Sequence, residues 1–87
     1  MMFNIVERYI SKLTKDDIRN FALNKDINLS DNELNFTFDF VKKNYKNVLG
    51  NPRLFKIERY KNNYSEENFN KISKVWHEYS QKYANYL

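Results

Sequence analysis

The chain has 87 residues with one glycine, one proline and no cysteine, which is enough for one domain and too short for two. Apolar residues make up 41% and aromatic residues 17%, so the chain can form a hydrophobic core, which argues against wholesale disorder. Without cysteine it has neither disulfides nor thiolate metal sites, which fits a reducing compartment. The chain also has no apolar run of membrane-spanning length and no signal-peptide core at its start. We therefore expect a cytoplasmic protein without membrane contact.

Three similar capping sequences predict where helices begin. Residues 13–18 (LTKDDI), 29–34 (LSDNEL) and 64–69 (YSEENF) each place Thr or Ser before an acidic first turn. Each also has an apolar residue on both sides of that turn, which can pack together as a hydrophobic staple. We therefore expect helix N-caps at Thr14, Ser30 and Ser65, with a full capping box between Ser30 and Glu33.

Predicted helix ends agree with these starts. Gly50 suits the left-handed position after a helix, and Asn51-Pro52 suits an N-cap followed by proline in the first turn. The Asn62-Asn63 pair suits the turn before Ser65, because asparagine tolerates a positive φ angle. The sequence thus predicts one all-α domain over residues 1–87, a compact bundle of about five helices at 3–12, 15–26, 31–49, 52–61 and 66–86.

Apolar spacing indicates how the two longest segments are buried. The third segment has apolar residues on two faces and is therefore predicted to be the central helix. One face carries Leu34, Phe38, Val41, Tyr45 and Val48, and the other carries Phe36 and Phe40.

The last segment carries a long aromatic stripe with spacings of three and four residues. For a helix of this length, docking onto its own domain is favoured over a coiled-coil seam, so we expect a monomer rather than a homodimer. If the stripe is exposed instead, it becomes a candidate interaction surface formed by Trp76, Tyr79 and Tyr83.

The residue inventory argues against an enzyme. The chain has a single histidine, His77, too few ligands of the usual kinds for a tetrahedral zinc site, and a single glycine, so phosphate-cradling loops are ruled out. The acid pairs at 16–17 and 66–67 point about 100° apart on a helix, and both sit in first turns where they favour the helix dipole. We expect no catalytic site, no metal and no cofactor.

Charge is unevenly distributed along the chain. Residues 1–40 carry five basic and seven acidic side chains, whereas residues 41–87 carry ten basic and four acidic ones. The densest basic stretch, 42–61, is interleaved with aromatic residues and could bind nucleic-acid phosphates or an acidic protein, or form a merely solvated face. The candidate surface comprises Lys42, Lys43, Lys46, Lys56, Arg59 and Lys61.

Two resemblances add to these expectations. Residues 13–34 resemble the helix–extended–helix pattern of SAP and Rho N-terminal modules, which implies a way of positioning two helices. Over nearly the whole chain, segments 13–18, 27–30, 50–52, 64–72 and 82–83 resemble a small uncharacterised family of Firmicutes, domain of unknown function 2624. That resemblance implies a cytoplasmic bacterial protein of similar length and supplies no activity or site residues.

Together these observations predict a small protein that acts by binding rather than by catalysis. The first hypothesis is a protein–protein interaction, as an adaptor or inhibitor, with a partner that the sequence does not identify. The alternative is a nucleic-acid-binding accessory protein that uses the basic region 42–61.

Overall fold

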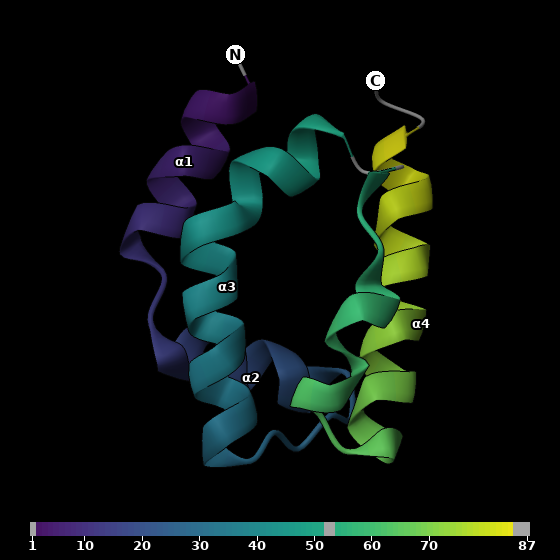
Figure 1. Ribbon diagram of the computed structural model, residues 1–87. Helices are drawn as coiled ribbons and strands as arrows, with labels where there is room; N and C mark the ends of the chain where they lie inside the picture. The colour runs from purple at the N-terminus through teal and green to yellow at the C-terminus, as the bar shows by residue number, and fades with distance from the viewer. Residues whose placement is uncertain (1, 52–53, 85–87) are drawn as a thin grey trace.

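The computed structural model describes residues 2–51 and 54–84, and within these ranges every regular element is a helix. Over the described residues, the α-helices are α1 (Met2–Lys12), α2 (Lys15–Asn24), α3 (Asp31–Gly50) and α4 (Glu66–Ala84), and a 3-10 helix, η2 (Ile57–Asn63), precedes α4. Figure 1 shows α3 and α4 rising in the same direction from one end of the molecule, with α1 beside α3 and α2 crossing at that end. The predicted all-α bundle is confirmed.

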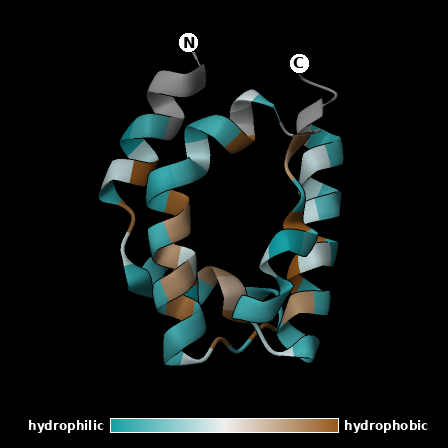
Figure 2. Ribbon diagram, in the orientation of Figure 1, coloured by the Kyte–Doolittle hydropathy of each residue, from teal (hydrophilic) through white to brown (hydrophobic). Residues whose placement is uncertain are grey.

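The buried core lies near the end where α3 and α4 begin. Its apolar members come from α2, the loop after it, α3 and η2. Figure 2 shows further hydrophobic residues on α3 and on the chain leading into η2. The most deeply buried apolar residues are Ile18, Ala22, Ile27, Leu34 and Ile57.

The helix starts form as the sequence predicts. The Thr14 hydroxyl accepts a hydrogen bond from the Asp17 amide at 3.1 Å, and the Asp17 carboxylate accepts one from the Thr14 amide at 2.9 Å. Ser30 and Glu33 form the same reciprocal pair, with distances of 3.2 and 2.8 Å. The Ser65 hydroxyl accepts from the Asn68 amide at 3.1 Å. All three predicted N-caps are therefore confirmed.

One carboxylate serves the starts of both long helices. Besides its bond to the Ser30 amide through Oε1, Glu33 accepts a hydrogen bond through Oε2 from the Ser65 amide at 2.7 Å. The Asn68 side-chain amide donates to Glu33 Oε1 at 2.8 Å and to the Asn28 carbonyl at 2.9 Å. Glu33 and Asn68 are both buried. This Glu33 clamp, formed by Ser30, Glu33, Ser65 and Asn68, holds the two helix starts side by side.

The clamp keeps Glu33 ionised. Burial by itself would raise the pKa of this carboxyl group. The hydrogen bonds from the Ser30 and Ser65 amides and from Asn68 favour the charged form, and the net result is a pKa below the ordinary value of 4.5.

Helix α2 ends at Asn24, two residues earlier than predicted, in a Schellman motif. The Ile27 amide donates to the Ala22 carbonyl at 2.8 Å, and the Asp26 amide donates to the Leu23 carbonyl at 3.0 Å. Asp26 occupies the left-handed position with φ of 61°. The sequence assigned a left-handed position to Gly50 instead, which was wrong: Gly50 is the last residue of α3 and has no positive φ.

The helix predicted over 52–61 is only partly correct. Residues 52 and 53 lie outside the described part of the chain, Leu54 is in a 3-10 turn, Phe55 and Lys56 are not helical, and η2 begins at Ile57. The segment then forms a 3-10 helix, in which residues three apart share an edge. Ile57 and Tyr60 therefore face the same way, while Asn62 and Asn63 end the 3-10 helix instead of forming a left-handed turn.

Helix α3 is the central helix, but its two predicted faces are divided differently. Phe36 and Phe40 line one cavity together with Val41, Tyr45 and Val48. Leu34 is buried. Phe38 lies elsewhere, with the ammonium groups of Lys15 and Lys42 at 5.6 and 5.3 Å from its ring centroid. The aromatic residues of α3 thus lie in two environments: Phe36, Phe40 and Tyr45 line an apolar cavity, and Phe38 packs against lysine ammonium groups.

We expect Glu33→Gln to lower the free energy of unfolding by about 2–3 kcal/mol, because a neutral amide leaves part of the buried donor set unpaired. Asp17→Asn is the matched control, since Asp17 caps only one helix and is exposed. Its cost should stay below about 1 kcal/mol. Equal losses in urea unfolding at neutral pH would contradict a shared role of Glu33 in both helix starts.

Wild type and Glu33→Gln should also differ in how their stability responds to acid. Folding lowers the pKa of Glu33, so its ionised carboxylate stabilises the folded state fully above about pH 4.5. This stabilisation is lost as the pH falls through the lower pKa of the folded state. Between about pH 6 and pH 3, wild type should therefore lose more stability than Glu33→Gln. Urea unfolding at several pH values measures this difference, and parallel losses in the two proteins would exclude Glu33 as its source.

We expect Asp26→Gly to raise the free energy of unfolding by about 0.5–1 kcal/mol, because glycine adopts the left-handed conformation without strain. The substitution also removes the exposed contact between Asp26 and Lys71 at 3.5 Å, which contributes little. Asp26→Ala removes the same carboxylate without relieving the backbone and should be destabilising. Thermal unfolding of both variants measures the contrast, and an identical effect of Gly and Ala would contradict it.

Candidate functional site

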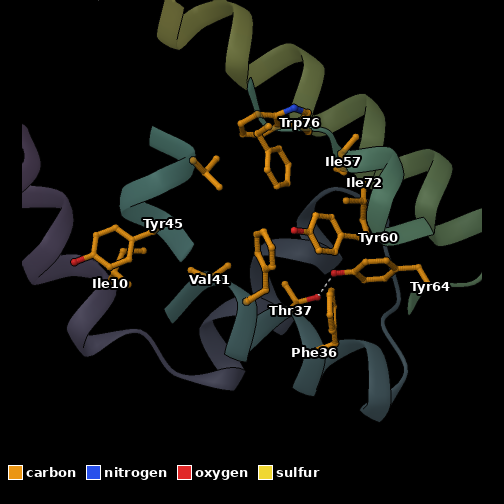
Figure 3. A pocket seen from close by; sticks show the side chains of 13 residues that line it. Ile10, Phe36, Thr37, Val41, Tyr45, Ile57, Tyr60, Tyr64, Ile72 and Trp76 are labelled. Carbon is orange, nitrogen blue, oxygen red and sulfur yellow. Dashed lines mark hydrogen bonds between the residues drawn. The ribbon is translucent and has the colours of Figure 1, made fainter. Parts of the chain in front are cut away.

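An apolar groove lies between α3 and the η2–α4 side of the molecule (Figure 3). Its volume is about 320 Å³. Six of its lining residues come from α3, four from the chain through η2 to Tyr64, two from α4 and one from α1. This aromatic groove is lined by Ile10, Phe36, Thr37, Phe40, Val41, Tyr45, Val48, Phe55, Ile57, Tyr60, Tyr64, Ile72 and Trp76.

A chain of aromatic rings crosses from α3 to α4 in the groove. Phe36 and Phe40 on α3 lie 6.1 Å apart between ring centroids, and Phe40 meets Tyr60 edge-on at 4.8 Å. Tyr60 stacks on Phe55 at 5.7 Å, and Phe55 meets Trp76 of α4 edge-on at 4.9 Å. The rings thus carry the packing from one long helix to the other.

Every ring of this series remains partly exposed. Phe36, Phe40, Phe55, Tyr60 and Trp76 are all intermediate in burial, and among the described residues no large side chain is fully buried. These rings therefore form a contiguous apolar patch that the chain itself covers only in part.

Two hydroxyl groups form the polar feature of the groove. Thr37 Oγ1 lies 2.8 Å from the Glu33 carbonyl, to which it donates, and 2.6 Å from the Tyr64 hydroxyl (Figure 3). A threonine hydroxyl has one proton, so Tyr64 is the donor in the second bond. Burial raises the pKa of Tyr64, against the opposing effect of the Thr37 hydrogen bond, so the phenol keeps the proton that it donates.

Two further cavities adjoin the aromatic groove. A smaller apolar cavity of about 170 Å³ shares Thr37, Tyr64, Ile72 and Trp76 with the groove and reaches toward α2. On another side, a recess of about 370 Å³ shares Phe40 and Phe55 with the groove and adds polar residues. The aromatic groove is therefore continuous with a smaller apolar cavity and with a more polar recess.

The structure divides the basic residues predicted as a surface. Lys42 is turned to α1, where its ammonium group donates to the Ile10 and Ser11 carbonyls at 2.6 and 3.1 Å. Lys46 pairs with Glu7 of α1 at 3.2 Å, and the hydrogen bond that its ammonium group donates to the Glu7 carboxylate raises the pKa of Lys46. The remaining candidates are exposed and come from α3, the chain before η2, and η2 itself; these are Lys43, Lys56, Arg59 and Lys61.

The predicted aromatic stripe of α4 is also divided. Trp76 is half-buried and lines the groove, as docking of α4 onto its own domain requires. Tyr79 is 40% exposed and packs edge-on against Phe21 of α2 at 6.1 Å. The Tyr83 side chain lies outside the described part of the structure.

Sequence reasoning found most of the groove's aromatic residues without joining them into one site. The sequence predicts Phe36 and Phe40 as a second buried face of α3, and Phe55 and Tyr60 are among the aromatic residues interleaved with the basic stretch 42–61. Thr37 was not singled out, and its only sequence signal is its place between two phenylalanines on the same helix. Ile10 lines the groove only because α1 packs on α3, and nothing in the sequence around Ile10 predicts that position.

Comparisons with known protein families, curated proteins and solved structures find no match for this chain. The likeness to domain of unknown function 2624 therefore stays a prediction based on the quoted segments. Over the described ranges 2–51 and 54–84, no cluster of three or more metal-ligating side chains occurs. In the same ranges no helix is both long and apolar enough to cross a membrane.

Tyr64→Phe should lower the free energy of unfolding by about 1 kcal/mol, because it removes the hydrogen bond to Thr37 and keeps the ring. Thr37→Val should remove the same bond from the other side. A double-mutant cycle by urea unfolding measures their coupling. Additive effects of the two substitutions would contradict the assigned bond between them.

Proposed function

We propose that this protein is a non-enzymatic binding domain whose aromatic groove receives the apolar face of an amphipathic helix from a partner protein. The observation that carries this proposal is the row of partly exposed rings lining an apolar groove between two long helices. Laying an amphipathic helix into a hydrophobic groove is one of the recurring modes of peptide recognition. A monomer acting in the cytoplasm is the setting in which we expect this binding.

The dimensions of the groove fit such a helix. Its α3 wall runs from Phe36 to Val48, which at a rise of about 1.5 Å per residue is about 18 Å, or about three turns of a docked helix. A volume of about 320 Å³ is at the lower end of the range of ligand pockets. It therefore accommodates the anchoring side chains of the partner, while the body of the partner helix lies above the groove.

Two observations favour a protein partner over nucleic acid. The rings cover one another, edge-on between Phe40 and Tyr60 and between Phe55 and Trp76 and stacked between Phe55 and Tyr60, so fewer ring faces are available for bases to stack on. Lys42 and Lys46, two of the six basic candidates for phosphate contact, are engaged with α1.

The test uses a designed ~15-residue helical peptide with leucines on one face and neutral polar residues elsewhere. Trp76, the only tryptophan of the chain, lines the groove and reports binding by its fluorescence. We expect saturable binding, and no binding of a peptide with the same composition in scrambled order.

Matched substitutions locate the site. Val48→Gln introduces a polar side chain into the groove and should weaken binding about five- to thirty-fold, a loss typical of an interface anchor. Leu23→Gln makes the same kind of change on α2 at a residue that is 52% exposed and does not line the groove. It should leave affinity unchanged. Absence of binding by wild type, or equal effects of the two substitutions, would contradict the proposed site.

A further inference from the structure

The segment that forms one wall of the aromatic groove is strongly basic on its outer side. Three of its residues, Phe55, Ile57 and Tyr60, line the groove. Lys56 lies between the first two in sequence, and Arg59 and Lys61 flank the third. All three basic residues are exposed. We name Lys56, Arg59 and Lys61 the basic rim.

The charges of the basic rim are not neutralised by acidic residues of the described chain. Within residues 2–51 and 54–84, the ion pairs involve Arg19, Lys46 and Lys71 as the basic partners. Glu58, also exposed, is the one acidic residue in the same segment. Three basic residues against one acidic residue leave this side of the groove with a positive excess.

The other walls of the groove do not share the positive excess of the basic rim. On α3, the exposed charged residues between the lining residues Phe36 and Val48 are Asp39, Lys43 and Lys46. Lys46 pairs with Glu7 of α1, so Asp39 and Lys43 leave one charge of each sign there. On α4, Lys74 and Glu78 are exposed two positions before and after Trp76 and carry opposite charges. Among these exposed residues, the positive excess therefore lies on the side formed by residues 54–61.

Resting on the proposed function, we infer that the partner helix is acidic along one flank. Its apolar face occupies the aromatic groove, and its carboxylates lie beside Lys56, Arg59 and Lys61. An apolar centre surrounded by a charged, solvent-accessible rim is the usual anatomy of a protein interface. Opposite charges at such a rim chiefly raise the association rate and select the partner, and their effect is screened by salt.

The experiment compares three peptides that share one leucine face. The neutral peptide described above is joined by one with three glutamates along a single flank and one with three lysines at the same positions. We expect the acidic peptide to bind at least about five-fold more tightly than the basic one at ~50 mM salt, with the advantage shrinking at ~300 mM salt.

A pair of charge reversals assigns the effect to the basic rim. Lys56→Glu/Lys61→Glu should abolish or invert the preference for the acidic peptide. Arg8→Glu/Lys74→Glu changes the net charge equally at exposed residues, each two positions from a groove-lining residue on its own helix and therefore turned away from the groove. That control variant should keep most of the preference.

The outcomes separate the two levels of the proposal. If the three peptides bind equally, or the basic one binds most tightly, the acidic partner is wrong and the groove proposal stands. If none binds, the proposed function itself fails. An unrelated single-stranded oligonucleotide is included at the same salt. If it binds more tightly than the acidic peptide and loses affinity on rim reversal, the basic rim belongs to a nucleic-acid site instead.

Discussion

The arrangement of this protein depends on one buried carboxylate that completes two helix starts. Glu33 closes the capping box of its own helix α3 and also receives the first free amide of α4 at Ser65. Asn68 returns from α4 to the same carboxylate, so the start of α4 is fully hydrogen-bonded only with α3 in place, and the Glu33 carboxylate receives all its donors only with α4 in place. A motif that is ordinarily local thus connects residues that are 32 and 35 positions apart in the chain. It fixes the two longest helices at one end and in the same direction.

The groove follows from that constraint. With α3 and α4 held together at their starts, packing along the rest of their length falls to the rings of Phe40, Tyr60, Phe55 and Trp76. Those rings join the two sides without closing the space between them, and an apolar groove of about 320 Å³ remains. The proposed binding of an amphipathic helix would complete the burial of these rings, which the chain leaves partly exposed on its own.

The sequence predicted the parts of this fold that obey local rules. Thr14, Ser30 and Ser65 were recognisable because an N-cap is defined by residues three apart. The left-handed residue was misplaced, because glycine is its usual occupant and Asp26 fills it here. The 3-10 helix was not predicted, because Asn51-Pro52 is a typical start of an α-helix. The groove could not be predicted, since it depends on where α1, α3 and α4 lie in space rather than on their individual patterns.

Lys42 has a consequence for how α1 forms. Helix α1 has 11 residues and no acid in its first turn, and a helix of that length is marginal alone in water. Its carbonyls at Ile10 and Ser11 are satisfied by an ammonium group that arrives from α3. Formation of α1 is therefore coupled to the presence of α3, and the two behave as one cooperative unit. Amide hydrogen exchange in α1 should accordingly track the opening of α3, rather than the fraying of an independent N-terminal arm.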